Sequence, residues 1–170
     1  MGLELGVAAL EEGGPFAFGS GTGSVTQPGP AWGLRLGVDV LSWLGFEGRY
    51  IGAYSSGNLP ENVGFLMTGG EAVVRLTLPT PYVRPYIFGG IGVYDFALLG
   101  SNAAVAASML NSSTQPGVPM GLGVELMLSW HVSFAVEATY RFQIGESFSR
   151  NDTIGGADLT TFTGVMRFRL

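Results

Sequence analysis

Cysteine and lysine are both missing from this 170-residue sequence, and histidine occurs once, as His131. Without cysteine there are no disulfides, no thiolate chemistry and few ways to build a zinc site. The formal net charge is −5, and phosphate contacts need clustered cationic side chains. These absences argue against a nucleic-acid partner and exclude cysteine-based catalysis.

Charge of either sign is also scarce. Only 12% of the residues are charged, against about 25% in an average soluble domain. Mean hydropathy is +0.34, yet no apolar run approaches the roughly 18 residues of a membrane-spanning helix. Apolar residues make up 46% of the chain and glycine occurs 28 times, so a disordered chain is excluded. A glycine-rich all-β protein remains, either a soluble sandwich, a soluble barrel or a membrane barrel.

Catalytic signatures are absent as well. The sequence has neither a G-x-S-x-G elbow nor H-E-x-x-H, and the glycines at 19–23 lack the Lys of a phosphate-binding loop. A single histidine beside Trp130 in a tight turn is more typical of an interfacial side chain than of a general base. The sequence therefore predicts a protein that is not an enzyme and has no metal site or cofactor.

Eight stretches alternate between apolar and small or polar residues with the period of two that strands have. They comprise residues of about 2–12, 31–41, 44–55, 65–78, 82–97, 118–129, 131–144 and 159–170. Each reaches the length of about 9 to 11 residues that a tilted strand needs to cross a bilayer. This pattern predicts eight antiparallel strands in one domain, residues 1–170.

The connections between these stretches alternate between short and long. Tight turns are expected near residues 42–43, 79–81 and 129–131. Long loops rich in Gly, Ser, Pro and Asn are expected at 13–30, 56–64, 98–117 and 145–158. The alanines within 98–117 leave both a short helix and an irregular loop open. Short and long connections at opposite ends predict an up-and-down barrel.

Each stretch has one apolar and one charged face, and the composition of the charged face decides which is inside. In the second stretch Trp32, Leu34 and Leu36 oppose Arg35 and Asp39. Across all stretches this face has seven Arg against six acids: Glu4, Arg35, Asp39, Glu47, Arg49, Glu71, Arg75, Arg84, Glu125, Glu137, Arg141, Arg167 and Arg169. Nearly equal numbers of Arg and carboxylate side chains, interleaved with Gly, are typical of a narrow polar interior. The charged face is therefore predicted to lie inside.

The alternative is a soluble lipocalin-like barrel with the apolar face inside. In the preferred arrangement the charges form an internal network. An eight-stranded barrel is only just wide enough to be filled by side chains, so the network is expected to plug the lumen rather than line a channel.

Aromatic residues gather near the ends of the stretches, as in the girdles of membrane barrels. The predicted girdle comprises Trp32, Trp43, Tyr54, Tyr82, Phe96, Trp130, Phe162 and Phe168. A barrel surrounded by lipid explains the position of these aromatic residues better than an apolar face packed into a dry core does. The predicted fold is therefore all-β: a closed, eight-stranded, antiparallel, up-and-down transmembrane β-barrel.

Two stretches, residues 84–94 (RPYIFGGIGVY) and 162–170 (FTGVMRFRL), resemble the small eight-stranded outer-membrane barrels of Gram-negative bacteria, OmpA-like in the broad sense. The first is similar to the fifth strand of that family. Family members commonly end in Phe, which the barrel-assembly machinery reads. This chain ends in Leu170, so the assembly signal is expected to rest on Met166 and Phe168 with Leu170.

The resemblance implies a mature outer-membrane protein whose signal peptide has been removed. Its implied partners are outer-membrane lipids, lipopolysaccharide and the barrel-assembly machinery, with an unknown surface ligand at the loops. The expected function is non-enzymatic: envelope integrity or surface interaction through the long loops. Transport of small or hydrophobic solutes, as in OmpW-like barrels, is the alternative. A lipid A-modifying enzyme comes third, because those enzymes use His with Ser at the outer side and His131 lies at the opposite end.

Overall fold

The structure is a computed structural model that describes residues 2–11, 26–27, 29–57, 64–99, 114–144 and 158–169. Side chains are described for residues 29–54, 66–95, 97, 114–142, 144 and 159–169. The regular elements among them are all strands: β1 Gly2–Glu11, β2 Thr26–Gln27, β3 Gly29–Asp39, β4 Leu44–Gly57, β5 Gly64–Thr77, β6 Val83–Leu99, β7 Gln115–Met127, β8 Val132–Gln143 and β9 Asp158–Phe168. This part of the chain holds no helix long and apolar enough to cross a membrane.

The eight long strands coincide with the eight alternating stretches to within a few residues. At the long loops, strand residues extend into the approximate loop ranges expected from the sequence. Strand β2 lies inside the predicted loop 13–30 and pairs with Ser56 and Gly57 of β4. Strand residues also occupy parts of the predicted loops 56–64, 98–117 and 145–158. Backbone pairing continues there after apolar alternation has ended, so periodicity cannot detect it. The open choice between helix and loop within 98–117 lies largely outside the described residues.

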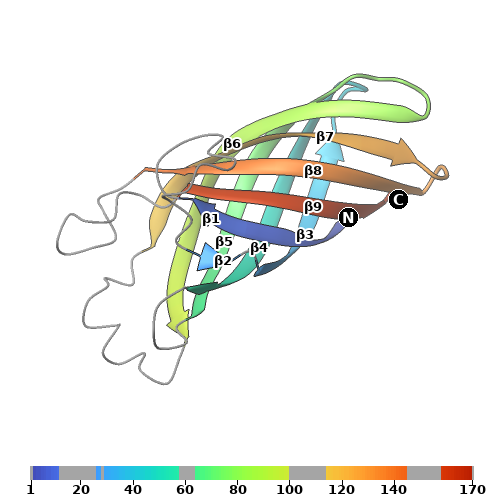
Figure 1. Cartoon of the computed structure of the whole chain (residues 1–170). Coiled ribbons are helices and arrows are strands. Elements are labelled where there is room, and N and C mark those ends of the chain that lie inside the picture. Colours follow the sequence, from blue (N-terminus) through green and yellow to red (C-terminus); the bar gives the residue numbers. More distant parts are fainter. Residues whose placement is uncertain are drawn as a thin grey trace.

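The strands form an antiparallel, up-and-down, barrel-like sheet, which confirms the predicted fold at this level. Each long strand pairs with its neighbours along the chain, in the order β4-β3-β1-β9-β8-β7-β6-β5, with a further pairing of β4 with β5. The first and last strands pair from Gly2–Arg167 to Glu11–Asp158. Figure 1 shows these strands side by side, with both chain termini at one end of the sheet.

Three tight turns, residues 40–43, 78–82 and 128–131, lie at the end that holds the termini, called the short-turn end below. In the first, the N–H groups of Val40 and Leu41 donate to the Leu44 carbonyl at 3.0 and 3.1 Å. In the third, Ser129 Oγ accepts the N–H groups of His131 and Val132 at 3.3 and 3.1 Å. The predicted short connections are confirmed, and the opposite end is called the long-loop end.

The charged face points inward and the apolar face outward. On β3 the side chain of Arg35 is 3% exposed, whereas Trp32, Leu34 and Leu36 are 39%, 48% and 67% exposed. The lipocalin-like alternative, with the apolar face inside, is therefore wrong. Most residues of the predicted girdle are exposed on the outside: Trp32, Trp43, Tyr82, Trp130, Phe162 and Phe168. Tyr54 is half-buried, and the side chain of Phe96 is outside the described set.

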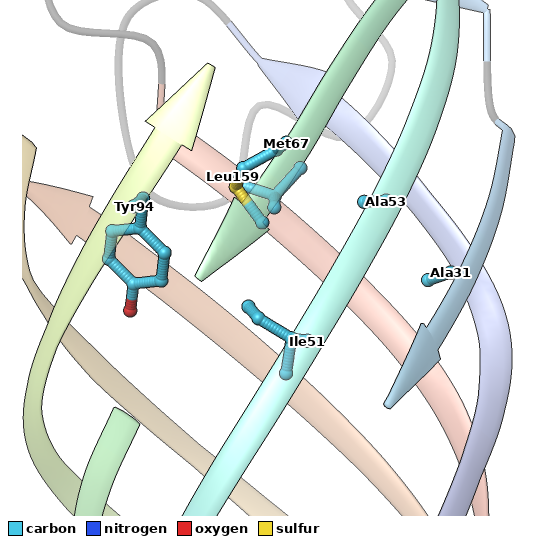
Figure 2. Packing of buried hydrophobic residues seen from close by; sticks show 6 residues of the cluster. All are labelled: Ala31, Ile51, Ala53, Met67, Tyr94 and Leu159. Carbon is cyan, nitrogen blue, oxygen red and sulfur yellow. The ribbon is translucent and has the colours of Figure 1, made fainter. Parts of the chain in front are cut away.

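The inner space, or lumen, also contains apolar groups. One cluster lines the inner wall (Figure 2) and comprises Ala31, Ile51, Ala53, Met67, Tyr94 and Leu159. A second comprises Val73, Tyr86, Phe88, Ala135 and Val165. Two of the inward rings of β6 face glycines of β7, since Tyr86 is in register with Gly123 and Phe88 with Gly121, whereas Tyr94 is in register with Gln115. Glycine makes room for the rings inside the narrow sheet.

We expect Gly123→Ala to lower the free energy of unfolding by about 1–3 kcal/mol, the usual range for overpacking. A Cβ at Gly123 meets Tyr86 Oη at 2.5 Å and the Val136 carbonyl oxygen at 2.8 Å, and the latter belongs to the backbone. The matched control is Gly70→Ala, because a Cβ at Gly70 meets nothing within 4 Å. Urea unfolding of the refolded variants checks the difference. Equal effects at the two positions would contradict this account of the packing.

Candidate functional site

Ion-paired side chains from six strands fill the lumen. Alternation along β3, β4, β5, β7, β8 and β9 places every second residue inward, and the charged residues occupy these positions. The following are all buried: Arg35, Glu47, Arg49, Glu71, Arg75, Glu125, Glu137, Arg141 and Arg167. A buried charge is tolerated only when it is paired and hydrogen-bonded, so the partners of each decide what the site can do.

Glu137 is the centre of this network. Arg35 donates to both of its carboxylate oxygens, at 2.7 and 2.8 Å, in the bidentate geometry that guanidinium favours. Arg49 Nη1 donates to Oε1 at 3.1 Å, Tyr86 Oη to Oε2 at 2.9 Å and Thr139 Oγ1 to Oε1 at 3.0 Å. Donors from four strands therefore converge on one carboxylate.

Arg49 links this centre to the next carboxylate. Its Nε and Nη2 donate to Glu47 Oε2 at 3.1 and 3.0 Å. Its guanidinium also lies 3.9 Å from the centroid of the Phe88 ring, a cation–π contact that is favoured where water is excluded. The inward ring of β6 thus contributes to holding the cation.

A second cluster lies toward the short-turn end, where Glu47 and Glu125 share two arginines. Arg75 Nη1 lies 3.3 Å from Glu47 and 3.6 Å from Glu125. Arg167 contacts the same two carboxylates at 3.2 and 3.6 Å. The outer members are Arg169, 3.2 Å from Glu125, and Asp39, which accepts from Arg75 Nη2 at 2.7 Å.

A third cluster lies toward the long-loop end. Arg141 Nε donates to Glu71 Oε1 at 2.6 Å, and its Nη1 donates to Thr161 Oγ1 at 2.7 Å. Tyr94 Oη also donates to Glu71 Oε1, at 3.0 Å. Tyr94 belongs to the first apolar cluster, so its ring joins the polar network to the apolar layer.

The structure brings most of the predicted charged residues together, with exceptions. Arg84, predicted to pair in the lumen, does not: it is half-buried, its Nε donates to the Thr80 carbonyl at 3.0 Å, and no described carboxylate pairs with it. Arg84 stands at the start of β6, where the backbone of the preceding turn is within reach. Asp39 and Arg169 are partly exposed at the mouth, with side chains 49% and 27% accessible. Glu4 is in register with Gly33 and Val165, and its side chain is outside the described set.

Of the predicted assembly signal, Met166 and Phe168 are exposed on the outer face of β9, and Leu170 lies outside the described residues. Sequence reasoning missed four inward groups, namely Tyr86, Phe88, Tyr94 and Thr161. It placed Ser133 and Thr139 on the inner face but assigned them no role in the network. The signal for the missed groups was present in part, because Tyr86, Phe88 and Tyr94 share the parity of Gly90 and Gly92 in β6. These even-numbered residues of β6 all lie on the crowded inner face.

Little space remains between the described lumen side chains. Two cavities of about 60 and 10 Å³ lie there, the first at the short-turn mouth and the second beneath the apolar layer. The larger hollows, of about 880 and 780 Å³, are shallow grooves on the outer apolar face near Leu36, Gly48 and Ala72. The described side chains contain no cluster of three His, Asp or Glu that would hold a metal ion.

Comparison with known proteins supports the same fold. A family model described as the outer membrane protein beta-barrel domain matches residues 1–165. Neisserial surface protein A is similar in structure, with a TM-score of 0.66 at 14% identity over 99% of this chain and 96% of that chain. The outer membrane enzyme PagL gives 0.53 at 17% identity, covering 98% and 99%.

Ail, the attachment invasion locus protein of Yersinia pestis, gives 0.52 at 14% identity, covering 99% and 97%. No curated protein matches this chain in sequence. At such identities the structural likeness shows the fold alone, and the family model, which spans nearly the whole chain, shows the family. The chain belongs to the family of outer membrane protein β-barrel domains, which are proteins of the outer membrane.

Proposed function

We propose that the chain forms a closed, eight-stranded transmembrane barrel with a plugged lumen, acting in envelope integrity or surface interaction. Closure is supported by the pairings, since each long strand has a partner on both sides. Membrane insertion is supported by the exposed apolar outer face with aromatic residues near its rims. Its environment is then outer-membrane lipid and lipopolysaccharide, reached through the barrel-assembly machinery.

The observation that carries the proposal is the saturation of Glu137 at the centre of the lumen. Five donor atoms from Arg35, Arg49, Tyr86 and Thr139 surround its two oxygens. A solute passing through must displace these groups and leave buried charges unpaired, which costs several kcal/mol. A barrel filled in this way serves as a rigid scaffold, and loops on a rigid scaffold are where binding usually occurs.

We expect purified, refolded chain to produce no stable single-channel currents in planar bilayers. The matched variant is Glu137→Ala with Arg35→Ala, which removes the central pair from the lumen and leaves the outer face unchanged. This variant is the positive control, because its conductance shows the current that an opened lumen produces. Stable currents from the unmodified chain would contradict the plugged scaffold.

The proposed surface role rests on the loops and is tested separately. Shortening residues 100–113 should leave folding, measured by heat-modifiable gel migration, unchanged and remove binding to cells or to envelope components. Retained binding after each long loop is shortened in turn would contradict a loop-borne surface role.

The proposal includes the absence of enzymatic activity. His131 lies exposed in a turn at the short-turn end. Among the described lumen hydroxyl groups, those of Tyr86, Tyr94, Ser133 and Thr139 donate to carboxylates. Thr161 accepts from Arg141, and the Thr163 hydroxyl makes no hydrogen bond with a described residue. None of these pairs a nucleophile with histidine as nucleophilic catalysis requires. An altered acyl pattern of lipid A in cells that express the chain would contradict this part of the proposal.

A second candidate function, transport of small apolar solutes, has one observation in its favour. The inner wall toward the long-loop end carries the apolar cluster of Figure 2, which a hydrophobic compound could contact. The cavity beside Ile51, Ala53 and Met67 is only about 10 Å³, about the space of one water molecule. The charged centre below it also disfavours an apolar path, so the scaffold role has the stronger support.

A further inference from the structure

A groove runs over the outer face of β4 and β5. Two hollows, of about 880 and 780 Å³, share Leu36, Gly48, Ala72 and Ile91 and therefore form one depression, called the outer groove below. The first hollow also reaches Val118 of β7. The four shared residues are in register across β3, β4, β5 and β6. Leu36 and Ile91 are 67% and 70% exposed, so they form the walls, and the small residues between them form the floor.

The floor of the outer groove is open and apolar. A Cβ at Gly48 meets only the Leu36 carbonyl oxygen, at 3.9 Å, and a Cβ at Gly70 meets nothing within 4 Å. The charged residues beneath the floor are buried and belong to the lumen network: Glu47, Arg49 and Glu71. The outer groove therefore offers dispersion contacts and no accessible charge.

The long-loop end of the outer groove is marked by amphipathic and polar side chains. Tyr50, which is 53% exposed, lines the groove there. The next row of outward residues is in register across four strands: Trp32, Gly52, Thr68 and Asp95. The Trp32 ring lies over Gly52, and Asp95 is exposed. Because Trp and Tyr rings prefer the headgroup level of a bilayer, the groove begins where the outer face changes from polar to apolar.

We propose that the outer groove seats one acyl chain of a bilayer lipid, with the lipid headgroup at the level of Thr68 and Asp95. This inference rests on the membrane insertion proposed above. Hydrocarbon surrounds the outer face in a membrane, so burial from water does not select the occupant. Close contact selects it, because an unfilled hollow forfeits the dispersion energy of the atoms that line it. A straight chain that lies along β4, from Tyr50 toward Phe46, restores these contacts.

A second copy of the chain fits the outer groove less well. Leu36 and Ile91 project on either side of the floor, so the convex wall of another barrel meets these two side chains before it reaches Gly48 and Ala72. A narrow, flexible acyl chain enters between them.

The experiment uses the full chain with Trp43→Phe and Trp130→Phe, which leaves Trp32 as the only tryptophan. The protein is refolded in vesicles of dioleoyl-phosphocholine brominated on its acyl chains, mixed with a rising fraction of dimyristoyl-phosphocholine. The two lipids share a headgroup, and bromine quenches Trp32 and widens the chain. Because the outer groove favours the narrow chain, we expect Trp32 fluorescence to recover at a severalfold lower fraction of dimyristoyl-phosphocholine than bulk exchange predicts.

Gly70→Leu fills the floor of the outer groove. A Cβ at this position meets no neighbour, so the variant should fold and lose the preference for the narrow chain. The matched control is Ala138→Leu, which adds the same side chain to β8, outside the groove. This control should retain the preference.

Recovery that follows the bulk fraction in the unmodified groove would overturn the proposal, as would a preference that survives Gly70→Leu or is lost equally in Ala138→Leu. A Trp32 signal that depends on the ratio of protein to lipid, and no longer does so in Gly70→Leu, would assign the groove to a second copy and overturn it too. Failure of the proposed membrane insertion gives a different result, because Trp32 would then not be quenched even in vesicles of brominated lipid alone.

Discussion

Glu137→Ala is expected to lower the free energy of unfolding by about 3–5 kcal/mol, the range measured when one partner of a buried ion pair is removed. The variant leaves Arg35 and Arg49, both 3% exposed, without the carboxylate they share. It also removes the acceptor of Tyr86 Oη. Urea unfolding in lipid vesicles, followed by tryptophan fluorescence, measures the change.

The control for this variant is Arg84→Ala. Arg84 is an arginine of the same predicted face, but among the described residues its side chain hydrogen-bonds the Thr80 carbonyl and forms no ion pair with a carboxylate. Its removal should cost about 1 kcal/mol or less, as for an ordinary hydrogen bond. Similar small losses for both variants would mean that water reaches Glu137 and that the lumen is not the dry, filled interior described above.

Leu122→Arg is expected to destabilise the barrel by about 2–4 kcal/mol, the cost of an arginine on the lipid face near the bilayer midplane. Leu122 lies midway along β7 and is 61% exposed. In water, an exposed leucine replaced by arginine changes stability within about 0.5 kcal/mol. The prediction therefore tests whether lipid covers the outer face.

Trp130→Arg is the matched control at the rim. Trp130 is 91% exposed in the turn between β7 and β8, where the cost of an arginine falls to about 0–1 kcal/mol. Unfolding of both variants in vesicles gives the depth dependence. An equal cost at both positions would contradict a membrane around β7.

The alternating stretches, the short turns and the inward face of most charged residues could be predicted from the sequence alone. These properties are local, because a strand places alternate residues on opposite faces and tight turns need few residues. Arg35 and Glu137 could thus be placed on the inner face without knowing where either one lies around the sheet. The same alternation placed Arg84 on the inner face. It could not show that the Arg84 side chain remains at the mouth, where it hydrogen-bonds the Thr80 carbonyl.

Which charges meet could not be predicted from the sequence, because it depends on the folded sheet. Arg35 and Glu137 are separated by 102 residues, and Arg141 and Glu71 by 70. Neither pair lies on adjacent strands, so no register of two neighbouring strands could bring them together. The contacts depend on the curvature of the whole sheet and the stagger of its strands, which set which side chains meet across the lumen. The small cavity at the short-turn mouth is likewise a product of that geometry, because it depends on how residues from β3, β4, β5 and the end of β9 pack around one space.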